Sequence, residues 1–136
     1  MNNAAIAFEN EDPTPFSGQA RKINFFGTLR FTETMLPLLR KSSSPRLVNV
    51  ASMAGHLRII KTPALNSKCA SAESTLTLSE LESLVEKFQA DVEAGRHAQE
   101  GWLNTCYGMS KLALIAATKI LARQEPSILI NACCPG

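Results

Sequence analysis

The chain of 136 residues has the length of one domain, and its hydrophobic content of 45% is enough for a packed core. Its formal net charge is only +2 and the basic residues form no run, so we expect no nucleic-acid binding. No window approaches the ~18 uninterrupted apolar residues of a membrane span. The first residues turn acidic without a basic segment, so we expect no secretory signal.

The four cysteines lack the spacing of a metal site. Cys133 and Cys134 are adjacent in an apolar run, and neighbours on a strand point to opposite faces. They therefore suit neither a shared metal ion nor a mutual disulfide. We expect reduced cysteines, no metal and a cytoplasmic protein.

Taken in chain order, the first elements are a strand end, a long helix and a buried strand. Met1–Phe8 is mostly apolar and has the character of a strand end that runs into a Pro-rich loop. Helical periodicity follows from Gln19 to Arg40, and Pro37 predicts a kink near the end of that helix. Arg46–Ala51 is short, valine-rich and apolar, which predicts a buried strand that leads directly to Ser52.

The segment 61–101 differs from its surroundings and is predicted to be a helical insertion. Within it, Thr77–Glu80 has the pattern of a capping box. Apolar residues recur behind it at helical spacing, at Leu81, Leu84, Val85 and Phe88. Gly95 is expected to end this helix. A further helix over about 104–123 and an apolar strand over 128–133 complete an order of elements typical of parallel βαβ units, so the predicted fold class is α/β.

Tyr107 and Lys111 lie four residues apart at the start of the last predicted helix, so they share one face. A free phenol holds its proton too tightly to donate it at neutral pH, and a neighbouring ammonium favours the phenolate. Such a pair can protonate an alkoxide as it forms. Ser52, at the end of a parallel strand, could hydrogen-bond a carbonyl. Taken singly, the pair is more often two polar residues on a helix rim, and the serine more often a cap or turn residue.

Five motifs follow one another along the chain. They are Asn2-Asn3-Ala4-Ala5, Asn24-Phe25-Phe26-Gly27-Thr28, Val48-Asn49-Val50-Ala51-Ser52, Tyr107-Gly108-Met109-Ser110-Lys111 and Asn131-Ala132-Cys133-Cys134-Pro135-Gly136. In this order they resemble the short-chain dehydrogenase/reductase family, and specifically its carbonyl reductase branch. That branch has a long helical insertion between the serine and the tyrosine, which covers the usual dimer face and implies a monomer. The resemblance implies a partial Rossmann-type, doubly wound parallel sheet.

The resemblance also implies roles for the motif residues. Tyr107 would be the general acid, and Lys111 would favour its phenolate and hold the nicotinamide ribose. Ser52 would orient the substrate carbonyl, and Asn24 would anchor a water that connects Lys111 to solvent. The remaining cofactor-lining residues would be Asn3, Ala4, Pro135 and Gly136, and the substrate pocket would include Ile6, Phe8 and Trp102. The implied reaction is the NADPH-dependent reduction of ketones, quinones or aldehydes to alcohols.

Parts of the family pattern have no counterpart in the sequence. The glycines are isolated, so the glycine-rich turn that holds the cofactor pyrophosphate is missing, and with it the residue that selects NAD or NADP. We therefore expect residues 1–136 to be a partial domain from the centre of the fold, without the N-terminal cofactor loop and the C-terminal portion. Ala5 replaces a glycine that approaches the cofactor closely.

The sequence also leaves room for functions other than carbonyl reduction. With only part of a parallel sheet, exposed strand edges predict low stability or aggregation of the chain alone. A non-catalytic truncated product or gene-model fragment, acting at most as an interaction module, is therefore the alternative to a reductase, and cofactor binding separates the two. A hydrolase is disfavoured because there is no Gly-x-Ser-x-Gly motif, and His56 and His97 lie in predicted loops or helix ends.

Overall fold

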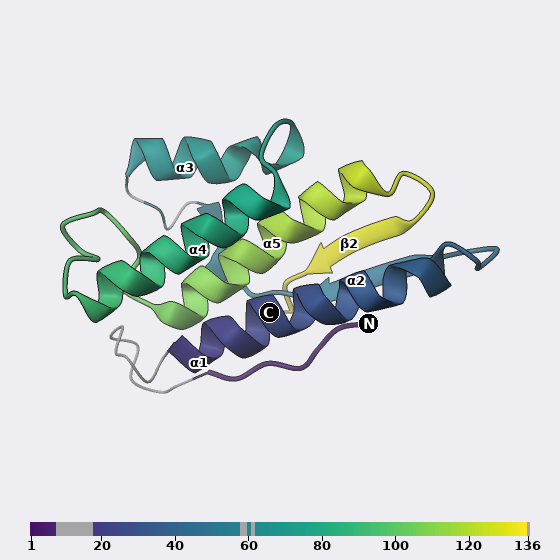
Figure 1. Cartoon of the computed structure of the whole chain (residues 1–136), viewed down its shortest axis with the longest axis horizontal. Coiled ribbons are helices and arrows are strands. Elements are labelled where there is room, and N and C mark those ends of the chain that lie inside the picture. Colours follow the sequence, from purple (N-terminus) through teal and green to yellow (C-terminus); the bar gives the residue numbers. More distant parts are fainter. Residues whose placement is uncertain (8–17, 58–59, 61, 136) are drawn as a thin grey trace.

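The fold is a layer of helices on one face of a small parallel sheet (Figure 1). The computed structural model describes residues 1–7, 18–57, 60 and 62–135. Strands β1 (Arg46–Val50) and β2 (Leu129–Cys133) pair in parallel. Asn2 adds an isolated parallel bridge to Asn49, outside the two strands. The α/β class with a parallel sheet that the sequence predicts is confirmed.

Helix α5 (Cys106–Gln124) lies at the centre of the helical layer, between α4 (Leu78–Glu93) and α2 (Thr28–Leu39) (Figure 1). Most of its side chains are buried, because neighbours cover it on several sides. The other helical elements are α1 (Gly18–Arg21), the π-helical turn η2 (Lys22–Gly27), the 3-10 turn η3 (Met53–Gly55), α3 (Pro63–Ala70) and the 3-10 turn η5 (Ser71–Glu73). Among the described residues, no helix has the length and apolar character needed to cross a membrane.

The long helix predicted for Gln19–Arg40 is observed as three pieces. A regular α1 passes into the π-helical turn η2, and α2 then continues to Leu39 with Pro37 inside its last turns. The irregular part is therefore the turn that contains the buried Asn24. Single π turns in α-helices occur frequently at functional sites. Hydrophobic periodicity does not reveal one widened turn, because the apolar face continues on either side of it.

The helix predicted after Thr77 is α4, and its boundaries follow the predicted signals. Glu80 N donates to Thr77 Oγ1 at 3.2 Å, and Thr77 N donates to Glu80 Oε2 at 2.9 Å, which confirms the capping box. Gly95 follows the C-terminal end with a φ of 68°, as expected of a helix-terminating glycine. The predicted apolar face is buried at Leu81, Leu84, Val85 and Phe88. That residues 61–101 are an insertion into a partial domain stays a prediction.

The helices cover one face of the sheet only, within the part of the chain that the structure describes. Leu47 and Ile130 point toward the helices and are buried. On the opposite face Leu129 is 58% exposed, and Asn131 and Cys133 are exposed as well. Parallel sheets are normally covered on both faces. The open face is consistent with the expected tendency to associate, which stays a prediction.

A network of hydrogen-bonded polar side chains joins four segments that are distant in sequence. Asn2 Nδ2 donates to Asn49 Oδ1 at 2.9 Å and to Thr32 Oγ1 at 3.1 Å. Asn49 Nδ2 donates in turn to Thr118 Oγ1 at 2.8 Å, and that hydroxyl donates to Leu114 O at 2.7 Å. Asn49 is only 1% exposed, so its amide group depends on these partners. The network therefore connects the N-terminal segment, α2, β1 and α5.

A glycine brings the turn η3 into direct contact with α5. A Cβ on Gly55 would lie 2.6 Å from both the carbonyl carbon of Lys111 and the amide nitrogen of Leu112. Such a distance is well inside van der Waals contact, so a larger residue would push the turn and the helix apart. Because η3 begins directly after Ser52, Gly55 determines how closely Ser52 approaches α5.

We expect Asn49→Ala to lower the free energy of unfolding by about 2 kcal/mol, because it leaves buried polar partners without hydrogen bonds. Asn131→Ala is the matched control, since it changes the same residue type on the exposed face of the neighbouring strand. It should change stability by less than about 0.5 kcal/mol. Urea unfolding of the three proteins measures both effects. An equal loss of unfolding free energy in the two variants would show that the hydrogen bonds of Asn49 do not stabilise the fold.

We expect Gly55→Ala to lower the free energy of unfolding by about 1–3 kcal/mol, the usual cost of overpacking against a rigid neighbour. Gly27→Ala is the control, because its Cβ would meet only Lys22 O at 3.3 Å. There the gain in helix propensity, at most about 1 kcal/mol, offsets the tighter contact. Thermal or urea unfolding compares the two. An unchanged stability of Gly55→Ala would show that η3 does not rest on the α5 backbone.

Candidate active site

The C-terminal ends of the strands meet at one edge of the sheet. Val50 N donates to Asn2 O at 2.9 Å, and Ala51 N donates to Cys133 O at 2.8 Å. These two bonds align the residues that follow each strand end, which are Asn3, Ser52 and Cys134. Open α/β sheets bind their ligands at this edge. Of the predicted site residues, Asn3, Ala4, Ser52 and Pro135 follow these strand ends.

Lys111 and Tyr107 lie together on α5, near the end of β1. Lys111 Nζ is 5.8 Å from the centre of the Tyr107 ring and donates to Val50 O at 2.8 Å. Lys111 is only 3% exposed. Burial lowers the pKa of its ammonium, and the electrostatic interaction with Cys134 acts in the opposite direction. Within the described part of the chain this carbonyl is the acceptor recorded for Lys111 Nζ, so two ammonium hydrogens remain for acceptors of a ligand.

Ser52 is half-buried and begins the turn η3. Its Oγ accepts a hydrogen bond from Ala54 N at 3.2 Å, so it has the role of a turn serine. That role does not use the hydroxyl hydrogen, which has no acceptor among the described residues. The Ser52 hydroxyl can therefore donate to a carbonyl oxygen while it caps the turn.

Asn24 joins the N-terminal segment to the turn of α5 that carries Tyr107. Its Oδ1 accepts from Ile6 N at 2.8 Å, and its Nδ2 donates to Ile6 O at 2.8 Å and to Ser110 Oγ at 3.0 Å. Ser110 Oγ donates in turn to Tyr107 O at 2.7 Å. Both amide hydrogens of the Asn24 side chain are thus in use, and a water on this side chain would bind at Oδ1.

The other predicted site residues have different surroundings. Trp102 packs edge-to-face against Phe88 with ring centres 5.5 Å apart, and its Nε1 donates to Asp91, so α4 holds its indole. Ile6 is half-buried beside Asn24, whereas Asn3, Ala4 and Pro135 are exposed. Phe8 and Gly136 lie outside the described residues. The substrate role of Trp102 stays a prediction.

Two supporting residues were missed by sequence reasoning. Ser110 is fully buried and connects Asn24 to Tyr107, and Gly55 sets the distance between η3 and α5. Ser110 is a polar residue inside an otherwise apolar helical stretch, which was an available signal. An isolated glycine after a strand end indicates a turn but does not reveal what the turn packs against.

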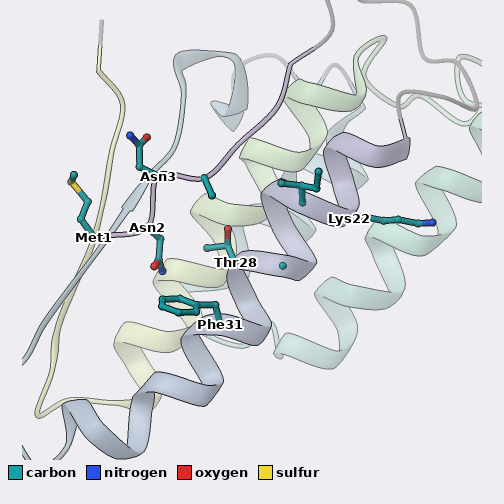
Figure 2. Close-up of a pocket in the computed structure, with 9 residues that line it drawn as sticks. Met1, Asn2, Asn3, Lys22, Thr28 and Phe31 are labelled. Atoms are coloured by element: carbon teal, nitrogen blue, oxygen red, sulfur yellow. The ribbon is translucent and has the colours of Figure 1, made fainter.

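A cavity of about 490 Å³ opens between the N-terminal segment and α2, with Phe31 and Thr28 facing Asn2 (Figure 2). Asn3 and Ala4 line it, together with Ile23 and other residues of η2 and α2. Ser52, Tyr107 and Lys111 do not line it. The cavity therefore adjoins the strand-end edge at Asn3 and Ala4 but does not include the candidate catalytic side chains.

Comparison with known proteins places the chain in a family. A family model described as short chain dehydrogenase matches residues 1–87. Carbonyl reductase [NADPH] 1 of Mus musculus is 42% identical over 145 residues, and carbonyl reductase [NADPH] 3 of Rattus norvegicus is 40% identical over 145 residues. Both alignments cover 100% of this chain and 51% of the relative. The chain thus spans about half the length of these relatives.

Two solved structures are similar over most of the described fold. Menthone neomenthol reductase from Mentha piperita superposes with a TM-score of 0.84 at 35% identity, covering 90% of this chain and 43% of that one. Salutaridine reductase from Papaver somniferum superposes with a TM-score of 0.81 at 31% identity, covering 88% and 41%. The sequence motifs, the parallel sheet and these likenesses agree, and the chain belongs to the short chain dehydrogenase family.

Proposed function

We propose that this chain carries the reactive groups of an NADPH-dependent carbonyl reductase, an oxidoreductase that converts ketones, quinones or aldehydes to alcohols. The observation that carries the proposal is the buried Lys111 ammonium beside Tyr107, with two hydrogens to spare, at the end of the strand that leads to Ser52. The names of the relatives, carbonyl reductase [NADPH] 1 and 3, support the same reaction.

The residues at the strand-end edge fit a nicotinamide cofactor. Lys111 has spare hydrogens for the hydroxyls of a ribose, and the exposed Asn3, Ala4 and Pro135 follow the strand ends beside it. We propose that these residues, with Tyr107 and Gly136, hold NADPH, as the branch implies. When bound, NADPH supplies the hydride that reduces the carbonyl carbon and is itself oxidised to NADP⁺.

The chain's own groups handle the proton and the developing charge. The Ser52 hydroxyl donates a hydrogen bond to the substrate carbonyl oxygen and so orients it. As the carbon gains the hydride, the oxygen gains negative charge and takes the proton of the Tyr107 phenol, which leaves an alcohol and a phenolate. Lys111 stabilises that phenolate. A water on Asn24 then connects Lys111 to solvent for reprotonation, and Ile6, Phe8 and Trp102 contribute to the substrate pocket.

We further propose that the protein acts as a monomer in the cytoplasm. The buried apolar face of α4 packs against α5, so this face of α5 is covered by the chain itself. None of the cysteines among the described residues forms a disulfide, which agrees with a reducing compartment. The alternative, a non-catalytic chain that binds partners through its sheet, is favoured by one observation, the 58% exposure of Leu129. Cofactor binding discriminates between the two.

We expect the purified chain to bind NADPH saturably, measured by the cofactor's fluorescence, and Lys111→Ala to weaken binding about tenfold or more because a charged contact is lost. Lys119→Ala is the matched control on the same helix, since Lys119 pairs with Glu73 instead. Binding should also weaken as pH rises through the lowered pKa of Lys111, because the ammonium is lost earlier than in a free lysine. This pH dependence should vanish in Lys111→Ala. No binding by the parent chain would favour the non-catalytic alternative.

We expect Tyr107→Phe to lower kcat for carbonyl reduction by about 100-fold or more, the usual contribution of a positioned general acid. NADPH binding should stay within about twofold, because Lys111 and the ring remain in place. Steady-state kinetics with NADPH and a quinone or ketone measure the effect. A Tyr107→Phe variant with unchanged kcat would refute the assignment of the general acid.

A further inference from the structure

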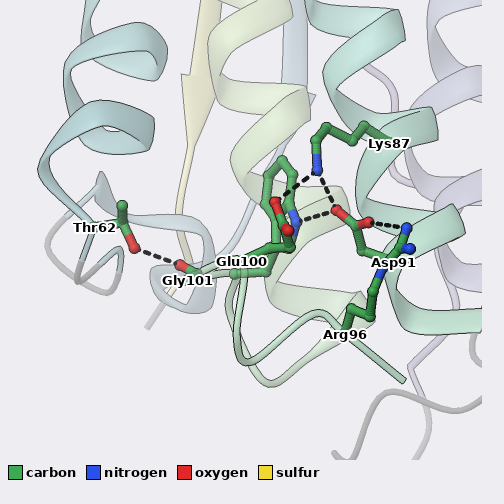
Figure 3. Close-up of polar contacts among 7 residues, drawn as sticks. Thr62, Lys87, Asp91, Arg96, Glu100 and Gly101 are labelled. Atoms are coloured by element: carbon green, nitrogen blue, oxygen red, sulfur yellow. Dashed lines mark hydrogen bonds and ion pairs between the residues drawn. The ribbon is translucent and has the colours of Figure 1, made fainter. Parts of the chain in front are cut away.

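Three side chains converge on one buried carboxylate in the last turns of α4 (Figure 3). Asp91 is only 2% exposed. Its Oδ2 accepts from Lys87 Nζ at 2.5 Å and from Trp102 Nε1 at 2.8 Å, and its Oδ1 accepts from Arg96 Nη2 at 3.1 Å. Two cations thus compensate one buried negative charge, and the third donor is the indole of a residue in the segment that leads to α5.

The backbone carbonyl of Asp91 holds the same segment. It accepts from Arg96 N at 2.7 Å and from His97 N at 3.1 Å, and Trp102 N donates to His97 O at 2.9 Å. Lys87 also pairs with Glu100 at 3.0 Å. The chain after α4 is therefore folded back against that helix by both the side chain and the backbone of one residue.

Trp102 and its neighbour Gly101 make further contacts besides the hydrogen bond to Asp91. Its ring packs edge-to-face against Phe88, and Lys87 Nζ lies 5.6 Å from its ring centre. The neighbouring Gly101 O accepts from Thr62 Oγ1 at 2.9 Å. Gly101 has a φ of 76°, and a Cβ there would lie 1.9 Å from Thr62 Oγ1, so this contact requires glycine. Thr62 precedes α3, so the segment is bonded to the start of that helix as well as to α4.

Only a few residues separate Trp102 from Tyr107, the proposed general acid. Leu103, directly after Trp102, is buried in the core, and Thr105 caps α5 by accepting from Gly108 N at 3.1 Å. Tyr107 is the second residue of α5. Leu103 is held by the core and Thr105 by its capping hydrogen bond, so the short connection cannot adjust to a shift of Trp102. A displacement of Trp102 would therefore also displace the first turn of α5, which carries Tyr107.

We propose that Asp91 is a positioning residue for Tyr107: it holds the segment from Arg96 to Trp102 against α4, and so determines where α5 begins. Its effect on catalysis rests on the proposed function, whereas its hold on Trp102 does not. Displacements of about 1 Å by changes remote from the chemistry can cost about 100-fold in rate. A positioning residue can therefore matter for turnover without contacting substrate or cofactor.

The carboxylate is well suited to this role because it stays charged. The hydrogen bond from Lys87 is the main cause that lowers the pKa of Asp91 from 3.8 to about 2, followed by that from Trp102. Burial acts in the opposite direction, and Arg96 adds to the lowering. The contacts of the Asp91 carboxylate with Lys87, Arg96 and Trp102 are therefore complete at neutral pH, and they weaken only as the pH falls from about 4 toward 2.

The test uses Asp91→Asn in the full chain, with Glu100→Gln as the matched control, because Glu100 is an exposed partner of the same Lys87. Trp102 is the only tryptophan and Tyr107 the only tyrosine, so fluorescence reports on both without a cofactor. We expect Asp91→Asn to red-shift the tryptophan emission, raise its quenching by acrylamide and alter energy transfer from Tyr107 to Trp102. In the same variant, kcat should fall about tenfold or more while the KM for NADPH stays within about twofold.

Each outcome decides the proposal. Unchanged fluorescence in Asp91→Asn would show that Asp91 does not hold Trp102, and changed tryptophan emission with unchanged energy transfer and kcat would overturn the positioning of Tyr107. If the parent chain shows no turnover, the proposed function fails, and energy transfer alone decides whether Asp91 positions Tyr107. Should circular dichroism show that Asp91→Asn is unfolded, Arg96→Gln removes a single donor and should change the same signals in the same direction, by less.

Discussion

The hydrogen bond from Lys111 Nζ to the Val50 carbonyl is the contact on which the arrangement of the candidate site depends. It joins a buried ammonium on α5 to the last residue of β1, so that the helix and the strand end keep a fixed relation. Removing an ammonium from water is costly, and one carbonyl replaces only part of the lost hydration, which is why the pKa of Lys111 is lowered. Ser52 and Tyr107 take their positions from the two elements that this bond connects.

Motifs and periodicity predicted the fold class and both strands almost residue for residue, because short valine- and isoleucine-rich stretches between turn signals have few other solutions. The capping box of α4 was equally readable, since it is a local pattern. The π-helical turn around Asn24 was not, because its cause is a set of bonds to Ile6 and Ser110, residues distant in sequence.

The candidate site was predictable only in part, for the same reason. The positions of Ser52, Tyr107 and Lys111 follow from motifs, and the structure places Lys111 beside Tyr107 and near the strand end that leads to Ser52. Asp91 was not recognisable, because it is one of several charged residues on α4 and burial alone distinguishes it from the others. Gly55 is significant only through a contact with a helix backbone more than 50 residues away. The catalytic roles themselves stay predictions.

The buried Asn49 has a consequence for which face of β1 meets the helices. In a parallel pair, a slip by one residue would turn Arg46, Val48 and Val50 inward in place of Leu47 and Asn49. Two valines offer more apolar surface than a leucine and an asparagine, so hydrophobic burial alone would not prevent that slip. The bonds from Asn49 to Asn2 and Thr118 exist in one register only. The slip would also turn the charged Arg46 toward the helices, so the hydrogen bonds of Asn49 and the cost of burying Arg46 both favour the observed register.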